Sequence, residues 1–297
     1  MMVAVAIGTW GLQNWFGGDF APAIDLIRRA DEKGVDQVSI TDHVVMGEHV
    51  ENYPYGPFYN PLDFPWYEPI SVLSAAAAVT RNIRLSTAIL ISPLRPAVLL
   101  AKQLATLDVL SRGRVDIGVG LGWQKEEYEA AGVPWEGRYL RLEEQIKVCK
   151  LLWGQAPASF SGETVQFDRI HAYPRPVQLN GIPILFGLAP TDKNFARIAE
   201  LGDGWLPMER DAAKLAGHID RLRQAFETQG RDPSRIAVRT VAPYVFREDG
   251  LADMDRTLEA VPALIEAGVT VVEFHPAWFG RGEKDFDAIL DGMTSIR

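Results

Sequence analysis

The sequence has a single cysteine, Cys149, and no basic region, and both shortages exclude classes of protein. One cysteine cannot form an internal disulfide, and its apolar helical surroundings predict a buried thiol. The 39 acidic residues outnumber the 30 basic ones, which gives a formal net charge of −9. A protein this acidic repels phosphate backbones and anionic lipid, so neither nucleic acid nor a membrane surface is expected as a partner.

Long apolar runs are absent as well, because no stretch approaches the roughly 20 residues that a membrane-spanning helix needs. The chain opens on a strand-like run at 3–7, with no charged region or small-residue cleavage site before it. These features predict a protein without a signal peptide that is located in the cytoplasm.

Several cofactor-binding and catalytic motifs are also missing. The glycines of 118–123 fail the dinucleotide fingerprint G-x-G-x-x-G, because its third glycine would fall on Trp123. The sequence contains no G-x-x-x-x-G-K-[ST] phosphate loop, no G-x-S-x-G nucleophile elbow and no H-E-x-x-H zinc motif. Acyl transfer therefore has no candidate nucleophile, and no metal site is expected.

What the sequence does contain is a regular alternation of short apolar runs and helical patterns. Apolar residues at 23, 26, 27 and 30, for example, recur with the period of one helix face between two strand-like runs. A polar stretch at 155–183, with a hairpin around Gly162, interrupts the alternation. Eight β/α units are predicted, with strands at 3–9, 35–41, 83–91, 114–119, 183–187, 204–206, 236–245 and 269–275.

Several of these runs are apolar on both faces, as parallel strands covered by helices are. Eight units fit a closed barrel better than an open sheet. We therefore predict an α/β fold, a (β/α)8 TIM barrel that forms a single domain over residues 1–297, with insertions at the C-terminal strand face. Chemistry in such barrels takes place at the C-terminal ends of the strands, so the residues there are the candidates.

Three strand ends carry candidate residues. Asp42 and His43 follow the second strand, where a histidine can accept or donate a proton near neutral pH. The glycine-rich segment 120–122 follows the fourth strand and lets backbone approach a ligand closely. Segment 187–189 leads into a helix whose N-terminus suits an anion such as phosphate. At each place a purely structural role, as a turn or a cap, is the alternative.

The loop at 44–66 lies on the same face. Such a loop either packs on itself or lines one wall of a pocket for a flat ligand. His275, at the end of the eighth strand, either faces this pocket or has a structural role. The aromatic residues of the loop are Tyr53, Tyr55, Phe58, Tyr59, Phe64 and Trp66.

Three segments occur in order along the chain: SITDHVV at 39–45, IRLSTAILISPLRPAVLLAKQLATLDVLSRGRVDIGVGLGW at 83–123, and PILFGLAPTDKNFARIAELGDGWLP at 183–207. Together they resemble the bacterial-luciferase-like family, also called the luciferase-like monooxygenase family. The resemblance runs from residue 3 to about residue 208, and the segment 99–123 is its most specific part. Within the family the sequence is most similar to members that use the deazaflavin coenzyme F420, and members that use FMN are close relatives.

The resemblance implies a barrel with the flavin-type ring at the C-terminal strand face. It also implies a non-proline cis peptide between Ala88 and Ile89, in a bulge of the third strand behind the ring. It places His43 near the reactive edge of the ring. The implied cofactor-binding residues are Asp42, Thr87, Ala88, Ile89, Gly120, Leu121, Gly122, Gly187, Leu188 and Ala189.

One position departs from the pattern of the family. Its sugar-phosphate dehydrogenases carry a catalytic glutamate directly after the glycine pair, where this sequence has Trp123. A sugar-phosphate substrate is therefore not expected. Instead we expect Trp123 to join Trp10 and Trp66 around a largely apolar substrate pocket.

The sequence thus predicts a flavin- or deazaflavin-dependent oxidoreductase with coenzyme F420 as its cofactor. Hydride would pass to or from a small, largely apolar organic substrate while His43 assists proton transfer. Two alternatives stay open. One is an FMN-dependent luciferase-like monooxygenase, and the other is a non-catalytic carrier or sensor that binds the coenzyme. The resemblance also implies a homodimer.

Overall fold

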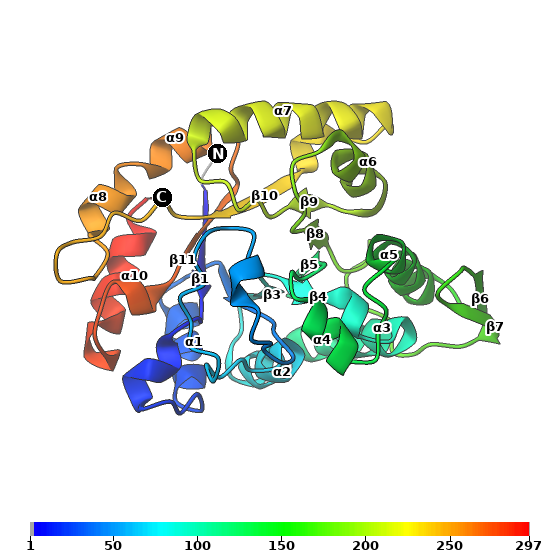
Figure 1. Ribbon diagram of the computed structural model, residues 1–297, viewed down its shortest axis with the longest axis horizontal. Helices are drawn as coiled ribbons and strands as arrows, with labels where there is room; N and C mark the ends of the chain where they lie inside the picture. The colour runs from blue at the N-terminus through cyan, green and yellow to red at the C-terminus, as the bar shows by residue number, and fades with distance from the viewer. Residues whose placement is uncertain (1–2, 297) are drawn as a thin grey trace.

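A computed structural model describes residues 3–296 and shows a parallel sheet surrounded by helices (Figure 1). The order of the strands in this sheet is β3-β2-β1-β11-β10-β9-β8-β5-β4. Its strands are β1 (Ala4–Gly8), β2 (Gln37–Ile40), β3 (Arg84–Thr87), β4 (Leu90–Ile91), β5 (Ile117–Gly120), β8 (Ile184–Phe186), β9 (Gly204–Trp205), β10 (Ala237–Val241) and β11 (Val271–Phe274).

The two ends of that order, β3 and β4, are consecutive pieces of one strand. Only Ala88 and Ile89 separate them along the chain, so the nine strands close into a barrel with eight strand positions. A parallel bridge between Leu85 and Val115 also joins β3 to the segment before β5. The (β/α)8 TIM barrel that the alternation predicted is confirmed.

Helices cover the outside of the barrel. The α-helices are α1 (Ala23–Glu32), α2 (Pro69–Val79), α3 (Ala97–Ser111), α4 (Lys125–Ala130), α5 (Arg138–Gly154), α6 (Asp192–Leu201), α7 (Ala212–Thr228), α8 (Met254–Leu258), α9 (Val261–Glu266) and α10 (Phe286–Thr294). Short 3-10 helices are η1 (Leu12–Phe16), η2 (Val50–Asn52), η3 (Ser92–Leu94), η4 (Pro233–Arg235), η5 (Pro276–Trp278) and η6 (Glu283–Asp285). Within residues 3–296, none of the helices has both the length and the apolar character to cross a membrane.

Local sequence patterns explain these elements. The predicted apolar stripe of α1 is buried, at residues 23, 26, 27 and 30. Strands β2, β5 and β8 are buried along their whole lengths, as expected for parallel strands covered by helices. Cys149 is buried in α5, and this burial raises the pKa of its thiol to about 12, so the thiol is protonated and unreactive at neutral pH.

Several element boundaries differ from the predictions. The predicted third strand is interrupted at Ala88–Ile89, and the predicted seventh strand ends at Val241, because Pro243 follows and has no N–H for the ladder. The predicted seventh helix is two short helices, α8 and α9, with Pro262 in the first turn of α9. The predicted hairpin is confirmed as β6 (Ala158–Ser161) and β7 (Gln166–Ile170), which project to the right of the barrel in Figure 1.

A buried polar network links four strands inside the barrel. Arg239, on β10, is 1% exposed and lies 3.3 Å from the Glu273 carboxylate on β11. Its Nη1 donates to Gln37 Oε1 (2.6 Å) and Ser86 Oγ (2.8 Å), on β2 and β3. Its Nη2 donates to the carbonyl oxygen of Thr87 at 2.6 Å, directly before the interruption of the third strand. Arg239 therefore fixes the backbone on which the candidate site is built.

Candidate cofactor and substrate site

The interruption of the third barrel strand creates an open patch of backbone at the C-terminal face. Ala88 and Ile89 are joined by a non-proline cis peptide, as the resemblance implied. Both residues are partly exposed, whereas Thr87 and Leu90 on either side are fully buried. The backbone N–H of Ala88 donates to the carbonyl oxygen of Ile40 at 3.0 Å, which holds the patch beside the end of β2.

Two glycines make room for the Ile89 side chain. A Cβ atom on Gly120 would lie 2.7 Å from Ile89 Cδ1, and one on Gly187 would lie 2.7 Å from Ile89 Cγ2. Because such contacts are shorter than carbon atoms tolerate, any side chain at either position would displace Ile89. Ile89, just before β4, therefore packs closely against the ends of β5 and β8, and a side chain at position 120 or 187 would make it shift.

Backbone donors border this surface. Among the hydrogen bonds of residues 3–296, none uses the N–H of Gly122, Leu188 or Ala189. Gly122 has a φ of +67°, a left-handed conformation that favours glycine. Helix α6 begins at Asp192, and its N-cap is Thr191, whose Oγ1 accepts a hydrogen bond from Asn194 N. The free N–H groups of Leu188 and Ala189 precede this helix N-terminus, where an anion such as the phosphate of a flat cofactor would fit, and that of Gly122 follows β5.

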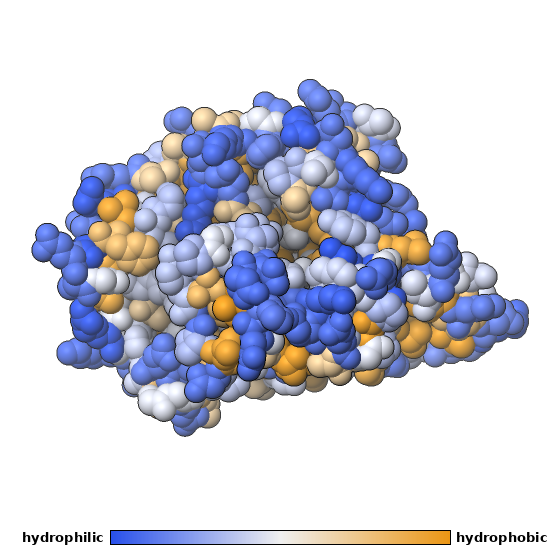
Figure 2. Space-filling view, in the orientation of Figure 1, coloured by the Kyte–Doolittle hydropathy of each residue, from blue (hydrophilic) through white to orange (hydrophobic). Residues whose placement is uncertain are grey.

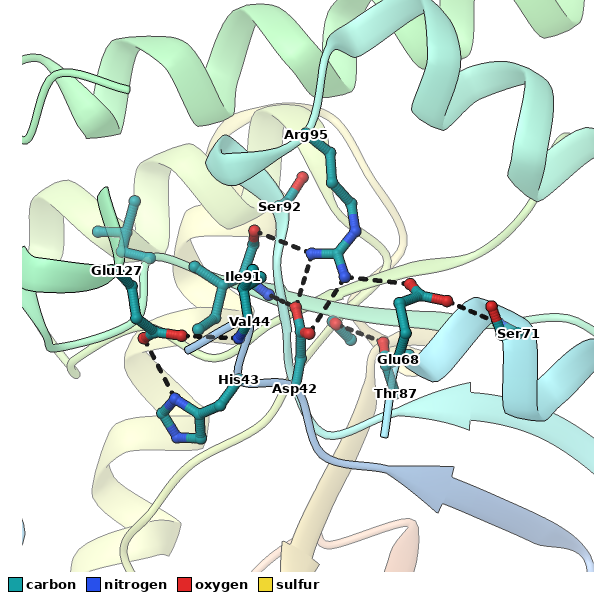
Figure 3. Close-up of polar contacts among 12 residues, drawn as sticks. Asp42, His43, Val44, Glu68, Ser71, Thr87, Ile91, Ser92, Arg95 and Glu127 are labelled. Carbon is teal, nitrogen blue, oxygen red and sulfur yellow. Dashed lines mark hydrogen bonds and ion pairs between the residues drawn. The ribbon is translucent and has the colours of Figure 1, made fainter. Parts of the chain in front are cut away.

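Asp42, which the resemblance implied as a cofactor-binding residue, has its carboxylate bonded to other groups of the protein. Its buried carboxylate accepts from Arg95 Nη1 (2.7 Å), Arg95 Nη2 (3.1 Å) and the backbone N–H of Ile91 (2.8 Å) (Figure 3). Both oxygens are thus occupied within the protein. Burial opposes the charge of Arg95, but hydrogen bonds and ion pairs with Asp42 and Glu68 raise the pKa of Arg95 above its usual value. These contacts connect the loop after β2 to Ile91 of β4 and to Arg95.

His43 is paired with a carboxylate that the sequence did not reveal. Its Nδ1 lies 3.1 Å from Glu127 Oε2, and the backbone N–H of Val44 donates to Glu127 Oε1 at 2.9 Å (Figure 3). Glu127, on α4, is fully buried, and the His43 side chain is 9% exposed. The only sequence signal for Glu127 is its place beside Tyr128 on the face of α4 that turns inward.

The three predicted tryptophans lie in one continuous aromatic wall. The His43 ring is 4.6 Å from that of Trp66 and 6.2 Å from that of Trp123, measured between ring centroids. Phe64 lies 4.8 Å from Trp66 and 5.7 Å from Trp10, which extends the wall away from His43. The loop at 44–66 therefore packs around His43, and Figure 2 shows this face of the molecule hollowed near its centre.

His275 closes the other end of this wall. Its ring lies 6.3 Å from that of Trp10 and 5.2 Å from that of Trp278. Its backbone N–H donates to the Tyr244 hydroxyl at 2.7 Å. Burial lowers the pKa of the His275 imidazole below its usual 6.5, although the charge of Glu273 opposes this shift. His275 is therefore a neutral, buried ring at physiological pH.

This lowered pKa makes the stability of the protein depend on pH. Below about pH 6.5 the unfolded chain protonates His275 while the folded protein does not, so the free energy of unfolding should fall as the pH falls. The slope from this group is at most about 1.4 kcal/mol per pH unit. When the free energy of unfolding is measured with urea between about pH 7.5 and pH 5, it should change less with pH in His275→Phe than in the wild type. The exposed His171→Phe control should keep the wild-type slope, and an unchanged slope in His275→Phe would contradict the assignment.

Fold and site together define the class of protein: a TIM barrel with its candidate site at the C-terminal strand ends, as in barrel enzymes. The chain belongs to the luciferase-like monooxygenase family, whose profile matches residues 3–276. Relatives in this family include F420-dependent and FMN-dependent oxidoreductases and monooxygenases.

Individual relatives differ in how much of the chain they match. An uncharacterized protein of Mycobacterium tuberculosis is 42% identical over 168 residues, which are 57% of this chain and 57% of that protein. An F420-dependent glucose-6-phosphate dehydrogenase of Kineococcus radiotolerans is 30% identical over 257 residues, 84% of this chain and 71% of the relative. An FMNH2-dependent dimethylsulfone monooxygenase of Pseudomonas putida is 39% identical over 115 residues, 38% of this chain and 31% of the relative.

Solved structures share the fold at low sequence identity. A monooxygenase from Streptomyces bottropensis superposes with a TM-score of 0.80 at 20% identity, covering 98% of this chain and 96% of that one. An F420-dependent secondary alcohol dehydrogenase, in complex with an F420-acetone adduct, gives a TM-score of 0.78 at 18% identity, covering 100% and 98%. These likenesses establish the barrel architecture.

Proposed function

We propose that this protein is a coenzyme F420-dependent oxidoreductase that transfers a hydride to or from a small, largely apolar organic substrate. The observation that carries the proposal is the open backbone patch at Ala88–Ile89, bordered by free N–H groups and adjoining the loop that bears His43. The F420-dependent relative aligns over 84% of this chain and the FMNH2-dependent one over 38%, which favours the deazaflavin.

In this proposal the chain binds the cofactor, orients the substrate against it and shields both from water. The patch at Ala88–Ile89 supports one face of the ring, and the N–H groups at 122 and 188–189 hold its polar edge and phosphate. The aromatic wall excludes water and covers an apolar substrate. His43 holds or accepts the proton at the substrate oxygen. Bound F420 would supply or accept the hydride itself.

Trp123 bears on the choice of substrate. It stands where the sugar-phosphate dehydrogenases of the family have a catalytic glutamate, and its ring lies 5.2 Å from that of Tyr53 and 5.4 Å from that of Phe58. Three aromatic rings at this place disfavour a charged sugar phosphate, because burying a phosphate against them would leave its charge uncompensated. We therefore propose ketones, secondary alcohols, enones or imines with apolar substituents.

Cofactor binding tests the proposal directly. The purified protein is titrated with F420 and, separately, with FMN, and each titration is followed by fluorescence. Tight binding of F420 alone supports hydride transfer, and consumption of reduced F420 with an enone, imine or ketone would establish turnover. Tight binding of FMN alone would replace the proposal with the monooxygenase alternative. Binding of F420 without turnover of any substrate would favour a carrier or sensor.

Adding one methyl group at Gly187 should weaken F420 binding. The new Cβ atom would lie 2.7 Å from Ile89 Cγ2, and overpacking of this kind costs about 1–3 kcal/mol. If the displaced Ile89 raises the free energy of the complex by that amount, the Kd of Gly187→Ala for F420 rises roughly 10- to 100-fold. Gly217→Ala on α7, whose Cβ would meet nothing within 4 Å, is the control and should keep the wild-type Kd. Equal affinities for the two variants would remove Gly187 from the site.

A further inference from the structure

Glu127 is a fully buried carboxylate, and the described part of the chain gives it no lysine or arginine partner. Its contacts within residues 3–296 are the ring nitrogen Nδ1 of His43 and the backbone N–H of Val44. A buried carboxylate is costly unless hydrogen-bond donors compensate its charge. The N–H of Val44 can only donate, so it occupies Oε1, and the second donor available to Oε2 is the His43 ring.

We propose that Glu127 is a positioning residue that holds His43 in the tautomer with its proton on Nδ1. An ionised carboxylate only accepts hydrogen bonds, so the ring nitrogen that faces it must carry the hydrogen. The Nε2 atom then has a free lone pair, and Figure 3 shows that edge of the ring turned away from Glu127. The rings of Trp66 and Trp123 contact the same imidazole. These two contacts and the one from the Glu127 carboxylate together fix the orientation of the ring and of its Nε2 atom.

The inference deepens the proposed function and rests on it for the proton step. If the substrate is an alcohol, His43 Nε2 would take its O–H proton and become an imidazolium, while bound oxidised F420 would accept the C–H hydride, which leaves a carbonyl compound. Glu127 compensates the positive charge of that imidazolium through Nδ1–H. In the reverse direction Nε2 would return the proton to the carbonyl oxygen, and bound reduced F420 would supply the hydride to the carbonyl carbon.

Glu127 also has a structural role, and the experiment must separate this role from its positioning of His43. Together with Gln124 it clamps the base of the 44–66 loop, because the Gln124 amide accepts from Gly47 N at 2.9 Å and donates to Gly47 O at 3.2 Å. Glu127→Gln keeps the loop contact, since an amide oxygen can still accept from Val44 N. Its NH₂ group, however, donates toward His43 Nδ1 and so favours the opposite tautomer. Gln124→Ala loosens the loop without touching His43 and is the matched control.

The test combines a tautomer measurement with kinetics. In ¹⁵N-histidine NMR spectra of the cofactor-free protein, with His43→Gln used for assignment, we expect the proton on Nδ1 in the wild type and in Gln124→Ala. In Glu127→Gln we expect it on Nε2. With F420 and a turned-over substrate, Glu127→Gln should lower kcat by about 10²–10⁴-fold, the range for a general base lost or held in the wrong tautomer. KM and the Kd for F420 should be little changed, and Glu127→Asp should restore part of kcat.

Failure of this inference can be distinguished from failure of the proposed function. A wild-type tautomer with the proton on Nε2, or no change in Glu127→Gln, overturns the inference whether or not F420 binds. A changed tautomer with unchanged kcat overturns the positioning role. If the tautomer switches as expected but neither F420 binding nor turnover is found, the tautomer assignment stands, and the proton step falls with the proposed function.

Discussion

Replacing His43 by alanine is expected to lower kcat by about 10²–10⁴-fold, the contribution of a positioned general acid or base. The Kd for F420 should stay close to that of the wild type, because the site proposed for the ring consists of the backbone at Ala88–Ile89 and of glycines 120 and 187. The His43 side chain instead contributes an imidazole whose Nδ1 is held by the buried Glu127 carboxylate. Steady-state turnover and fluorescence titration of the same preparation measure the two quantities.

The exposed histidine His171 offers a control for this substitution. His171→Ala removes the same chemical group outside the site and should leave both kcat and Kd unaltered. A His43→Ala enzyme that turns over at the wild-type rate would take His43 out of the mechanism. A variant that loses F420 binding instead would make His43 part of the cofactor platform.

Replacing Arg239 by methionine is expected to lower the free energy of unfolding by about 3–5 kcal/mol, because breaking a buried ion pair leaves an uncompensated charge. The change would strand the Glu273 carboxylate and would also remove the donors to Gln37, Ser86 and the carbonyl oxygen of Thr87. Methionine has a similar length and no charge, so the loss reports the network rather than a large cavity. Urea denaturation followed by circular dichroism measures the difference.

Two further variants show how much of the loss in free energy of unfolding comes from the buried ion pair. The double variant Arg239→Met with Glu273→Gln removes the stranded charge and should recover part of the loss. Arg281→Met, at an exposed pair 3.8 Å from Asp249, should change stability by less than about 1 kcal/mol. If Arg239→Met were as mild as Arg281→Met, the buried network would contribute little to holding the third strand.

Local patterns in the sequence were sufficient for the barrel. Each strand and helix is specified by neighbours within one or two turns of chain, so the eight β/α units could be predicted from periodicity and the hairpin near Gly162 from the polar stretch that contains it. The glycine segments at 120–122 and 187–189 could be placed at the active face for the same reason, since strand order along the chain decides which turns share that face. The cis peptide at Ala88–Ile89 came from the family resemblance alone.

What the sequence determined by itself is therefore the barrel and the strand ends at which the candidate site and its glycines lie. Only the tertiary structure decided the partners of its charged groups. Glu127 meets His43 across 84 residues, and Arg239 meets Gln37 across 202. In a linear sequence a lone glutamate or arginine looks like part of a solvated face. Its neighbours in the sequence do not show whether water or a residue from another strand will stabilise its charge. Closing the barrel brings the strand ends together, and that closure alone pairs these charges, turns Asp42 toward Arg95 and joins the tryptophans into one wall.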